Sequence, residues 1–162
     1  MEDKDLIRYS RHIMLPEIDI EGQISISSSK IAVVGLGGLG CSASVYLAAS
    51  GVGELNLIDN DLIDLSNLQR QILFSEADLN KKKVDTAKIK LTSLNENIKV
   101  NSCNLRLSKS NIRKILEGSE IVLDCSDNFE TRKVINAYCL NEKKILISGS
   151  VSYTHLRAHE TS

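Results

Sequence analysis

Apolar and polar positions follow two distinct rhythms along the chain. Short apolar runs predict buried strands, at residues 31–34, 55–59, 98–103, 121–125 and 145–147. Longer stretches with apolar residues at helical spacing predict helices at residues 39–50, 80–95 and 128–143. A shorter helix is expected between Ser108, as its cap, and Gly118. Because strand and helix alternate, the sequence predicts an α/β fold with a doubly wound, mostly parallel sheet covered on both faces.

Both ends of the chain depart from this alternation. Residues 9–20 predict an N-terminal helical segment interrupted at Pro16, and the serine-rich "ISISSSK" is expected to lead into the first strand. From about Val151 the rhythm is lost, and "VSYTHLRAHETS" has the character of non-native read-through, with a genuine polar tail as the alternative. We therefore expect one domain at residues 1–150, incomplete at its C-terminus, and a non-native tail at residues 151–162.

Composition narrows the function classes only a little. The chain has 162 residues, 42% hydrophobic, with a net charge of −1, which gives no case for nucleic acid or membrane as an obligatory partner. Its four cysteines are scattered without a C-x-x-C pair, so neither a zinc site nor a disulfide framework is indicated within this chain. A soluble, cytoplasmic protein is the expectation.

A glycine-rich motif follows the first predicted strand. "GLGGLG" places Gly35, Gly37 and Gly40 in the pattern G-x-G-x-x-G, which turns the chain tightly and presents helix N-terminal amides to phosphate. Asp59 ends the next strand, where an acid can bind ribose hydroxyls. These residues predict a Rossmann-like nucleotide site, and taken alone they indicate an NAD-dependent dehydrogenase.

The residues after Asp59 argue against a redox enzyme. Asn67, Gln69 and Arg70 cluster with Gln71 in the turn, and an arginine offers a planar set of donors to phosphate oxygens. Asn67 and Arg70 are three apart, so on a helical turn they point the same way. By spacing alone, Lys83 is more typical of a solvated helix face, on a helix that buries Val84, Ala87, Leu91 and Leu94.

A second acidic position follows the strand at 121–125. Asp127 can hold Mg²⁺ through one carboxylate together with substrate phosphates. Asp124 either shares that role or caps the strand. Cys125, on the buried strand, is expected to be a small core residue.

Four stretches carry a family resemblance: "RYSRHIMLPEIDIEGQ", "VVGLGGLGCSASVYLAASGVGELNLIDND", "SNLQRQILF" and "VLDCSDNFETR". Together they resemble the ThiF/MoeB/HesA family, bacterial relatives of ubiquitin-activating enzymes, over residues 6–150. The resemblance implies an adenylyltransferase that uses ATP and Mg²⁺ to adenylate the C-terminal glycine carboxylate of a small ubiquitin-fold sulfur-carrier protein, in thiamine or molybdopterin biosynthesis. It also implies a homodimer.

The resemblance assigns roles to individual residues. Gly38 and Asp59 are expected on the adenosine side of ATP, Asp127 on the metal, and Arg11 in the active site of the dimer mate. Arg11, Arg70 and Lys83 are the expected catalytic residues. The full set expected to contact the nucleotide is Gly35, Gly37, Gly38, Gly40, Asp59, Asp61, Asn67, Gln69, Arg70, Lys83, Asp127 and Asn128.

The chain also departs from the family. Full-length relatives continue with two C-x-x-C pairs, so structural Zn²⁺ is expected only in that missing C-terminal part, and this fragment is expected to be inactive. Three alternatives stay open: an NAD-dependent oxidoreductase, a non-catalytic nucleotide-binding or dimerisation module, and a relative acting on another acid, such as a modified tRNA base.

Overall fold

A single parallel sheet forms the centre of the molecule in the computed structural model, which describes residues 2–149. Its strand order is β3-β2-β1-β4-β5, and every neighbouring pair is parallel. The strands are β1 (Lys30–Val34), β2 (Glu54–Ile58), β3 (Lys99–Cys103), β4 (Ile121–Asp124) and β5 (Ile145–Ser148). The predicted α/β fold is confirmed, with each strand within one residue of its predicted position.

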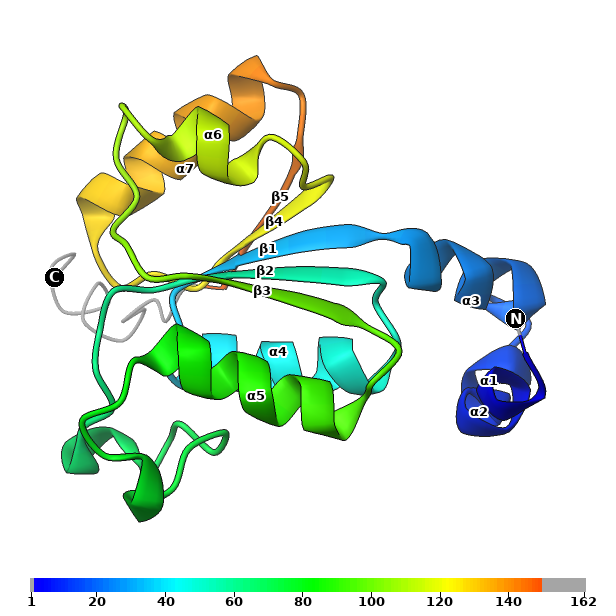
Figure 1. Ribbon diagram of the computed structural model, residues 1–162. Helices are drawn as coiled ribbons and strands as arrows, with labels where there is room; N and C mark the ends of the chain where they lie inside the picture. The colour runs from blue at the N-terminus through cyan, green and yellow to red at the C-terminus, as the bar shows by residue number, and fades with distance from the viewer. Residues whose placement is uncertain (1, 150–162) are drawn as a thin grey trace, which may run out of the picture.

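Helices cover the two faces of the sheet (Figure 1). Helices α4 (Gly38–Ala49) and α5 (Lys83–Leu94) lie on one face, and α6 (Ile112–Leu116) and α7 (Phe129–Asn141) lie on the other. The chain runs outward from β1 through β2 to β3, and then returns to place β4 on the other side of β1. This reversal leaves a crevice at the carboxyl ends of β1 and β4, where open α/β sheets bind ligands.

Alternation along the strands divides the core in two. Ile31 and Val33 of β1 point to the α4 and α5 face, where Leu55, Leu57, Val84 and Leu91 are also buried. Ala32 and Val34 point to the opposite face with Val122, Leu116 and Ile135. Burial on both faces explains why the strand sequences are continuously apolar.

The N-terminal segment is more helical than the sequence predicted. Helices α1 (Asp3–Arg8) and α2 (Ser10–Ile13) are followed by α3 (Asp19–Ser28), so most of "ISISSSK" is helix and not a lead into the strand. The hydroxyls of Ser28 and Ser29 both donate to the Ser25 carbonyl, within the helix and its cap, and buried Gln23 fixes the helix against the domain. Tertiary packing therefore overrides the weak helix propensity of serine.

Two smaller predictions are also wrong. The N-cap residue of α6 is Asn111 and not Ser108, and the Asn111 side chain accepts from the preceding Ser108 amide at 2.8 Å without capping a helix amide. Leu94 is 44% exposed at the end of α5, where the buried position belongs to Asn95. The tail at residues 151–162 lies outside the described residues. Within residues 2–149, no helix is long and apolar enough to cross a membrane.

Candidate nucleotide-binding site

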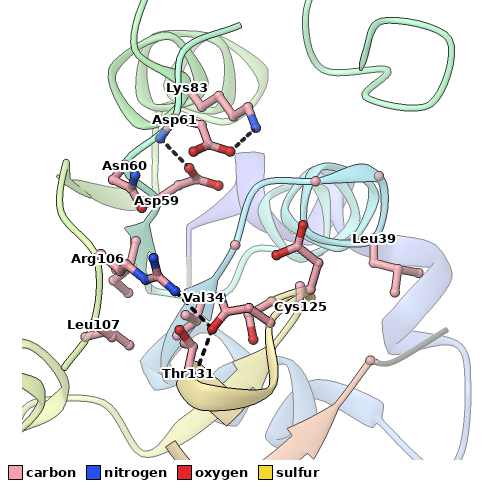
Figure 2. Close-up of a pocket in the computed structure, with 18 of the residues that line it drawn as sticks. Val34, Leu39, Asp59, Asn60, Asp61, Lys83, Arg106, Leu107, Cys125 and Thr131 are labelled. Carbon is pink, nitrogen blue, oxygen red and sulfur yellow. Dashed lines mark hydrogen bonds and ion pairs between the residues drawn. The ribbon is translucent and has the colours of Figure 1, made fainter. Parts of the chain in front are cut away.

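A cleft of about 930 Å³ opens at the carboxyl ends of the strands. It is bounded by the glycine loop after β1, the polar turn after β2, the loop after β3 and the start of α7 (Figure 2). Ten of the residues predicted to bind nucleotide line it: Gly35, Gly37, Gly38, Asp59, Asp61, Asn67, Arg70, Lys83, Asp127 and Asn128. Pockets of this size accommodate small-molecule ligands.

Close approach of neighbouring backbone explains the glycines at the base of the loop. Gly35 has a φ of +91°, and a Cβ there would lie 2.8 Å from the Cys125 carbonyl oxygen. A Cβ on Gly40 would lie 1.8 Å from the Gly35 oxygen, so Gly40 packs α4 against the loop and does not line the cleft. Gly37, in contrast, has nothing within 4 Å of a Cβ position and borders open space beside the N-terminus of α4.

Asp59 holds the glycine loop to the next turn. Its Oδ2 accepts from the Leu36 amide at 2.6 Å, and its Oδ1 accepts from the Asp61 amide at 2.7 Å. Both bonds come from backbone, so the carboxylate is fixed in place at the cleft wall. Each oxygen keeps lone-pair capacity for a ligand hydroxyl.

The polar turn after β2 brings Asn67, Arg70 and Gln71 together. Asn67 Oδ1 accepts from Arg70 Nη2 at 3.0 Å and from Gln71 Nε2 at 3.2 Å, which confirms that Asn67 and Arg70 face the same way. Arg70 Nη1 also donates to the Ser66 carbonyl at 3.2 Å. With its oxygen engaged twice, the Asn67 amide keeps its NH₂ group for a ligand, and the arginine is held ready at the cleft.

Lys83 is not on a solvated helix face. Its side chain is 5% exposed, and Nζ donates to Asp61 Oδ2 at 3.0 Å, while Asp61 is 60% exposed (Figure 2). The lysine begins α5, where the chain turns back toward the glycine loop. A buried ammonium needs a partner, so the Asp61 pairing keeps a positive charge at the cleft wall.

Asp124 and Asp127 have different roles. Asp124 is buried, and its Oδ1 accepts from the Ser126 amide at 3.0 Å and from the Ser126 hydroxyl at 2.6 Å, so it caps the strand end. Asp127 is exposed and lines the cleft, and no hydrogen bond or ion pair from residues 2–149 engages its carboxylate. One free carboxylate beside a phosphate-sized space suits Mg²⁺, which takes few protein ligands.

The start of α7 completes the wall. Asn128 caps the helix, with its Oδ1 accepting from the Thr131 amide at 2.9 Å. Arg132 donates to the Ser126 carbonyl through Nε at 3.1 Å and Nη2 at 2.6 Å. These bonds fix the backbone between Asp124 and the helix, and therefore the position of Asp127.

Sequence reasoning missed several lining residues, because most lie on loops without a motif. They include Asn60, Leu105, Arg106, Leu107, Thr131 and Arg132. The sequence places Gln71 in the polar cluster but predicts no role for it. Gln71 is 2% exposed, and its Oε1 has no hydrogen-bond partner among residues 2–149. The position of Leu105, Arg106 and Leu107 directly after a strand was the available signal.

Cys125 packs against the core, as predicted, and it also lines the cleft. It follows β4 and is only partly buried. Burial, helped by the neighbouring Asp124 carboxylate, raises the pKa of its thiol to about 11. Burial likewise raises the pKa of Cys41 to about 12. Both thiols are therefore protonated at neutral pH and are poor nucleophiles.

Besides Gly40, two further predicted site residues do not line the cleft of their own chain. Gln69 is exposed and is not among the lining residues. Arg11 is exposed on α2. This helix lies beside α3, which leads into the amino end of β1, whereas the cleft lies at the carboxyl ends of the strands (Figure 1).

A model of the ThiF family matches residues 9–158. The chain belongs to the ThiF family. The match includes eight positions of the segment predicted to be foreign, which lie outside the described residues. The predicted domain boundary at residue 150 therefore stays a prediction.

Members of the ThiF family with curated names are similar over most of the chain. It is 45% identical over 150 residues to a molybdopterin-synthase adenylyltransferase of Haemophilus influenzae, covering 93% of this chain and 62% of that protein. It is 43% identical to the sulfur carrier protein ThiS adenylyltransferase of Escherichia coli, covering 93% and 60%. The chain thus spans about 60% of the length of these relatives.

Solved structures show the same fold. Escherichia coli MccB bound to succinimide is 33% identical, with a TM-score of 0.79, covering 88% of this chain and 44% of that chain. Another MccB structure contains AMPCPP and MccA, at 33% identity and a TM-score of 0.76. Escherichia coli tRNA N6-threonylcarbamoyladenosine dehydratase has a TM-score of 0.86 at 24% identity, covering 94% and 66%, and supports the fold alone.

Proposed function

We propose that this chain is the nucleotide-binding part of an adenylyltransferase that activates the C-terminal glycine carboxylate of a small ubiquitin-fold sulfur-carrier protein, in thiamine or molybdopterin biosynthesis. The observation that carries the proposal is the arrival of Arg70, Lys83 and Asp127 in the same cleft as the glycine loop. Hydride transfer needs no such charges, whereas nucleotidyl transfer builds negative charge that cations stabilise. The names of the relatives and the presence of AMPCPP in MccB support an adenine nucleotide.

The proposed reaction is attack by the carrier carboxylate on the α-phosphorus of ATP. A bond forms between a carboxylate oxygen and phosphorus, the bond to the bridging oxygen breaks, and pyrophosphate leaves with its electron pair. A carboxylate needs no general base, so catalysis depends on positioning and on charge neutralisation by Arg70 and Lys83. Asp127 would hold Mg²⁺, which neutralises phosphate charge.

The proposal includes a homodimer in which Arg11 acts in the partner's site. Arg11 belongs to α2, which lies beyond the amino ends of the strands, whereas the cleft lies at their carboxyl ends (Figure 1). This separation from its own cleft supports a role in the partner's site. A two-fold partner makes both sites equivalent. A cytoplasmic location belongs to the same proposal, because free cysteines such as Cys41 and Cys139 are typical of reducing compartments.

ATP–pyrophosphate exchange on the full-length parent tests the activity. Exchange that requires a sulfur-carrier protein ending in glycine is expected, and a carrier lacking that residue is the control. Tighter binding of NAD than of ATP in calorimetry, with no exchange for any carrier, would return the assignment to an oxidoreductase.

Mixing variants tests the shared site. Subunits carrying Arg11→Ala and subunits carrying Arg70→Ala should each be inactive, but their heterodimer keeps one intact site. Recovery of exchange after mixing is therefore expected. No recovery, once subunit exchange has been verified by mass, contradicts the Arg11 assignment.

A further inference from the structure

The loop after β3 carries a cation into the cleft that the proposed reaction does not use. Leu105 and Leu107 are buried in or against the core beneath α6 and α7. Arg106, between them, is exposed and lines the cleft. All three residues line the cleft; Leu107 is buried and Leu105 partly buried, whereas Arg106 is exposed and is therefore the side chain of this loop that a ligand can reach most easily.

The loop is held in place by its own hydrogen bonds. The Leu105 amide donates to the Cys103 carbonyl at 3.0 Å, and Asn111 Nδ2 donates to the Arg106 carbonyl at 3.0 Å. Asn111 Oδ1 also accepts from the Ser108 amide at 2.8 Å. The backbone that presents Arg106 is therefore ordered before any ligand arrives.

The guanidinium reaches across the cleft toward the start of α7. Arg106 Nη2 donates to Asn128 Oδ1 at 3.4 Å, and Figure 2 shows the side chain extending from its loop toward Thr131. The bond is long, and the same oxygen already accepts the Thr131 amide at 2.9 Å. Most of the guanidinium donors are thus uncommitted among residues 2–149.

The cleft is chemically divided. Three apolar lining residues belong to one core cluster: Val34 and Ile58, at the ends of β1 and β2, and Leu107, next to Arg106 in the chain. Arg70 and Lys83 supply positive charge to the cleft wall, and Asp59 lines the same cleft. A nucleotide is divided in the same way into a flat, weakly polar base and a charged phosphate chain.

We propose that Arg106 is a specificity-determining residue that stacks its guanidinium on the outer face of the purine base, while Val34, Ile58 and Leu107 contact the base from the protein side. The inference rests on the proposed function, because it takes ATP as the ligand. Guanidinium groups stack on aromatic faces and contribute most where water is excluded.

Binding of ATP and of base-free tripolyphosphate to the 162-residue chain tests the stacking. Arg106→Ala should raise the dissociation constant for ATP about threefold to thirtyfold and leave that for tripolyphosphate unchanged. Arg106→Lys keeps the charge but not the plane, so it should recover only part of the loss. Lys109→Ala, an exposed cation on the same loop, is the matched control and should change neither ligand.

The outcomes separate the inference from the function beneath it. An equal loss of affinity for ATP and for tripolyphosphate would show that Arg106 binds phosphate. No loss of affinity for either ligand would leave Arg106 only its hydrogen bond to Asn128. Either result overturns the stacking. Loss for ATP alone, in a protein whose parent shows no carrier-dependent exchange, would support the stacking while the proposed function fails. Failure of the unsubstituted chain to bind ATP overturns both.

Discussion

The two ends of the sheet treat polar side chains in opposite ways. At the amino ends of the strands, Gln23 and Asn95 are fully buried. Gln23 Nε2 donates to the Ser50 carbonyl at 2.9 Å, and its Oε1 bonds His12 Nδ1 at 3.0 Å. Asn95 Nδ2 donates to the Tyr9 hydroxyl and to the Ala48 carbonyl, both at 2.9 Å. This closed polar cluster ties the N-terminal helices to the domain.

At the carboxyl ends of the strands, several polar groups keep donors, acceptors or charges that no other group of residues 2–149 engages. Gln71 is as buried as Asn95, yet its Oε1 has no partner among residues 2–149. Asp61 is 60% exposed while it holds a buried lysine, and Asp127 is exposed and unengaged. Closed polar groups at one end serve stability, and open ones at the other serve a ligand. Substitutions should therefore separate into two classes.

Arg70→Ala in the full-length parent should have the largest effect on activity. Loss of one preorganised donor to the transition state lowers rates by about a hundredfold or more, and pyrophosphate exchange should fall by that factor. The melting temperature should change little, because the arginine is exposed. Lys88→Ala, an exposed cation on α5, is the control. Unchanged pyrophosphate exchange in Arg70→Ala would contradict the claim that the polar groups at the carboxyl ends of the strands act on the ligand.

Asn95→Ala should have the opposite profile. Truncation leaves the Tyr9 hydroxyl and the Ala48 carbonyl buried without their donor, which costs about 1–3 kcal/mol of unfolding free energy. Denaturant unfolding measures the loss, and Asn97→Ala, an exposed neighbour, should stay within about 0.5 kcal/mol of the parent. ATP affinity of the folded fraction should not change. Weaker ATP binding at unchanged stability would contradict the scaffold role.

The same contrast explains what the sequence could predict. The sheet and its helices follow from apolar runs, and the glycine loop and Asp59 follow from a motif whose spacing is set by backbone approach to phosphate. Local pattern failed where tertiary contacts decide: α3 forms from a serine-rich stretch because Gln23 docks it, and Lys83 is buried because Asp61 lies opposite.

Loop residues were the hardest to predict. Arg106 has no motif, and only the position of its loop beside Asn128 gives it a candidate role. Asp124 and Asp127 are the same residue type, three positions apart, and only the fold distinguishes the strand cap from the open carboxylate. Residue type and spacing identify candidate chemistry, but burial and hydrogen-bond partners determine which candidates stay available.

A third polar cluster, around Asp78, extends the comparison between the two ends of the sheet. Asp78 lies between Gln71 and Lys83 in the sequence, and both of these line the cleft, but Asp78 does not. Asp78 is buried and accepts from Lys90, from Lys81 at 3.4 Å, and from the Ser75 amide and hydroxyl at 3.0 and 2.8 Å. All its partners lie within the protein, so it belongs with the closed class. Asp78→Asn should lower unfolding free energy by about 1 kcal/mol near neutral pH, and should leave ATP affinity unchanged.

The loss of stability in Asp78→Asn, the smallest effect predicted, should depend on pH in a specific direction. The hydrogen bond from Lys90, supported by Ser75, holds the pKa of Asp78 below its ordinary value. A carboxyl group whose pKa is lowered on folding stabilises the protein above its unfolded pKa of about 3.9, and that contribution is lost as the pH falls toward the folded pKa. The difference in stability between the parent and Asp78→Asn should therefore be constant from pH 7 to about pH 5 and shrink below pH 4. Asp85→Asn, at an exposed carboxylate on α5 that makes no side-chain hydrogen bond or ion pair among residues 2–149, is the control. A gap that widens on acidification would show that Asp78 does not act through its charge.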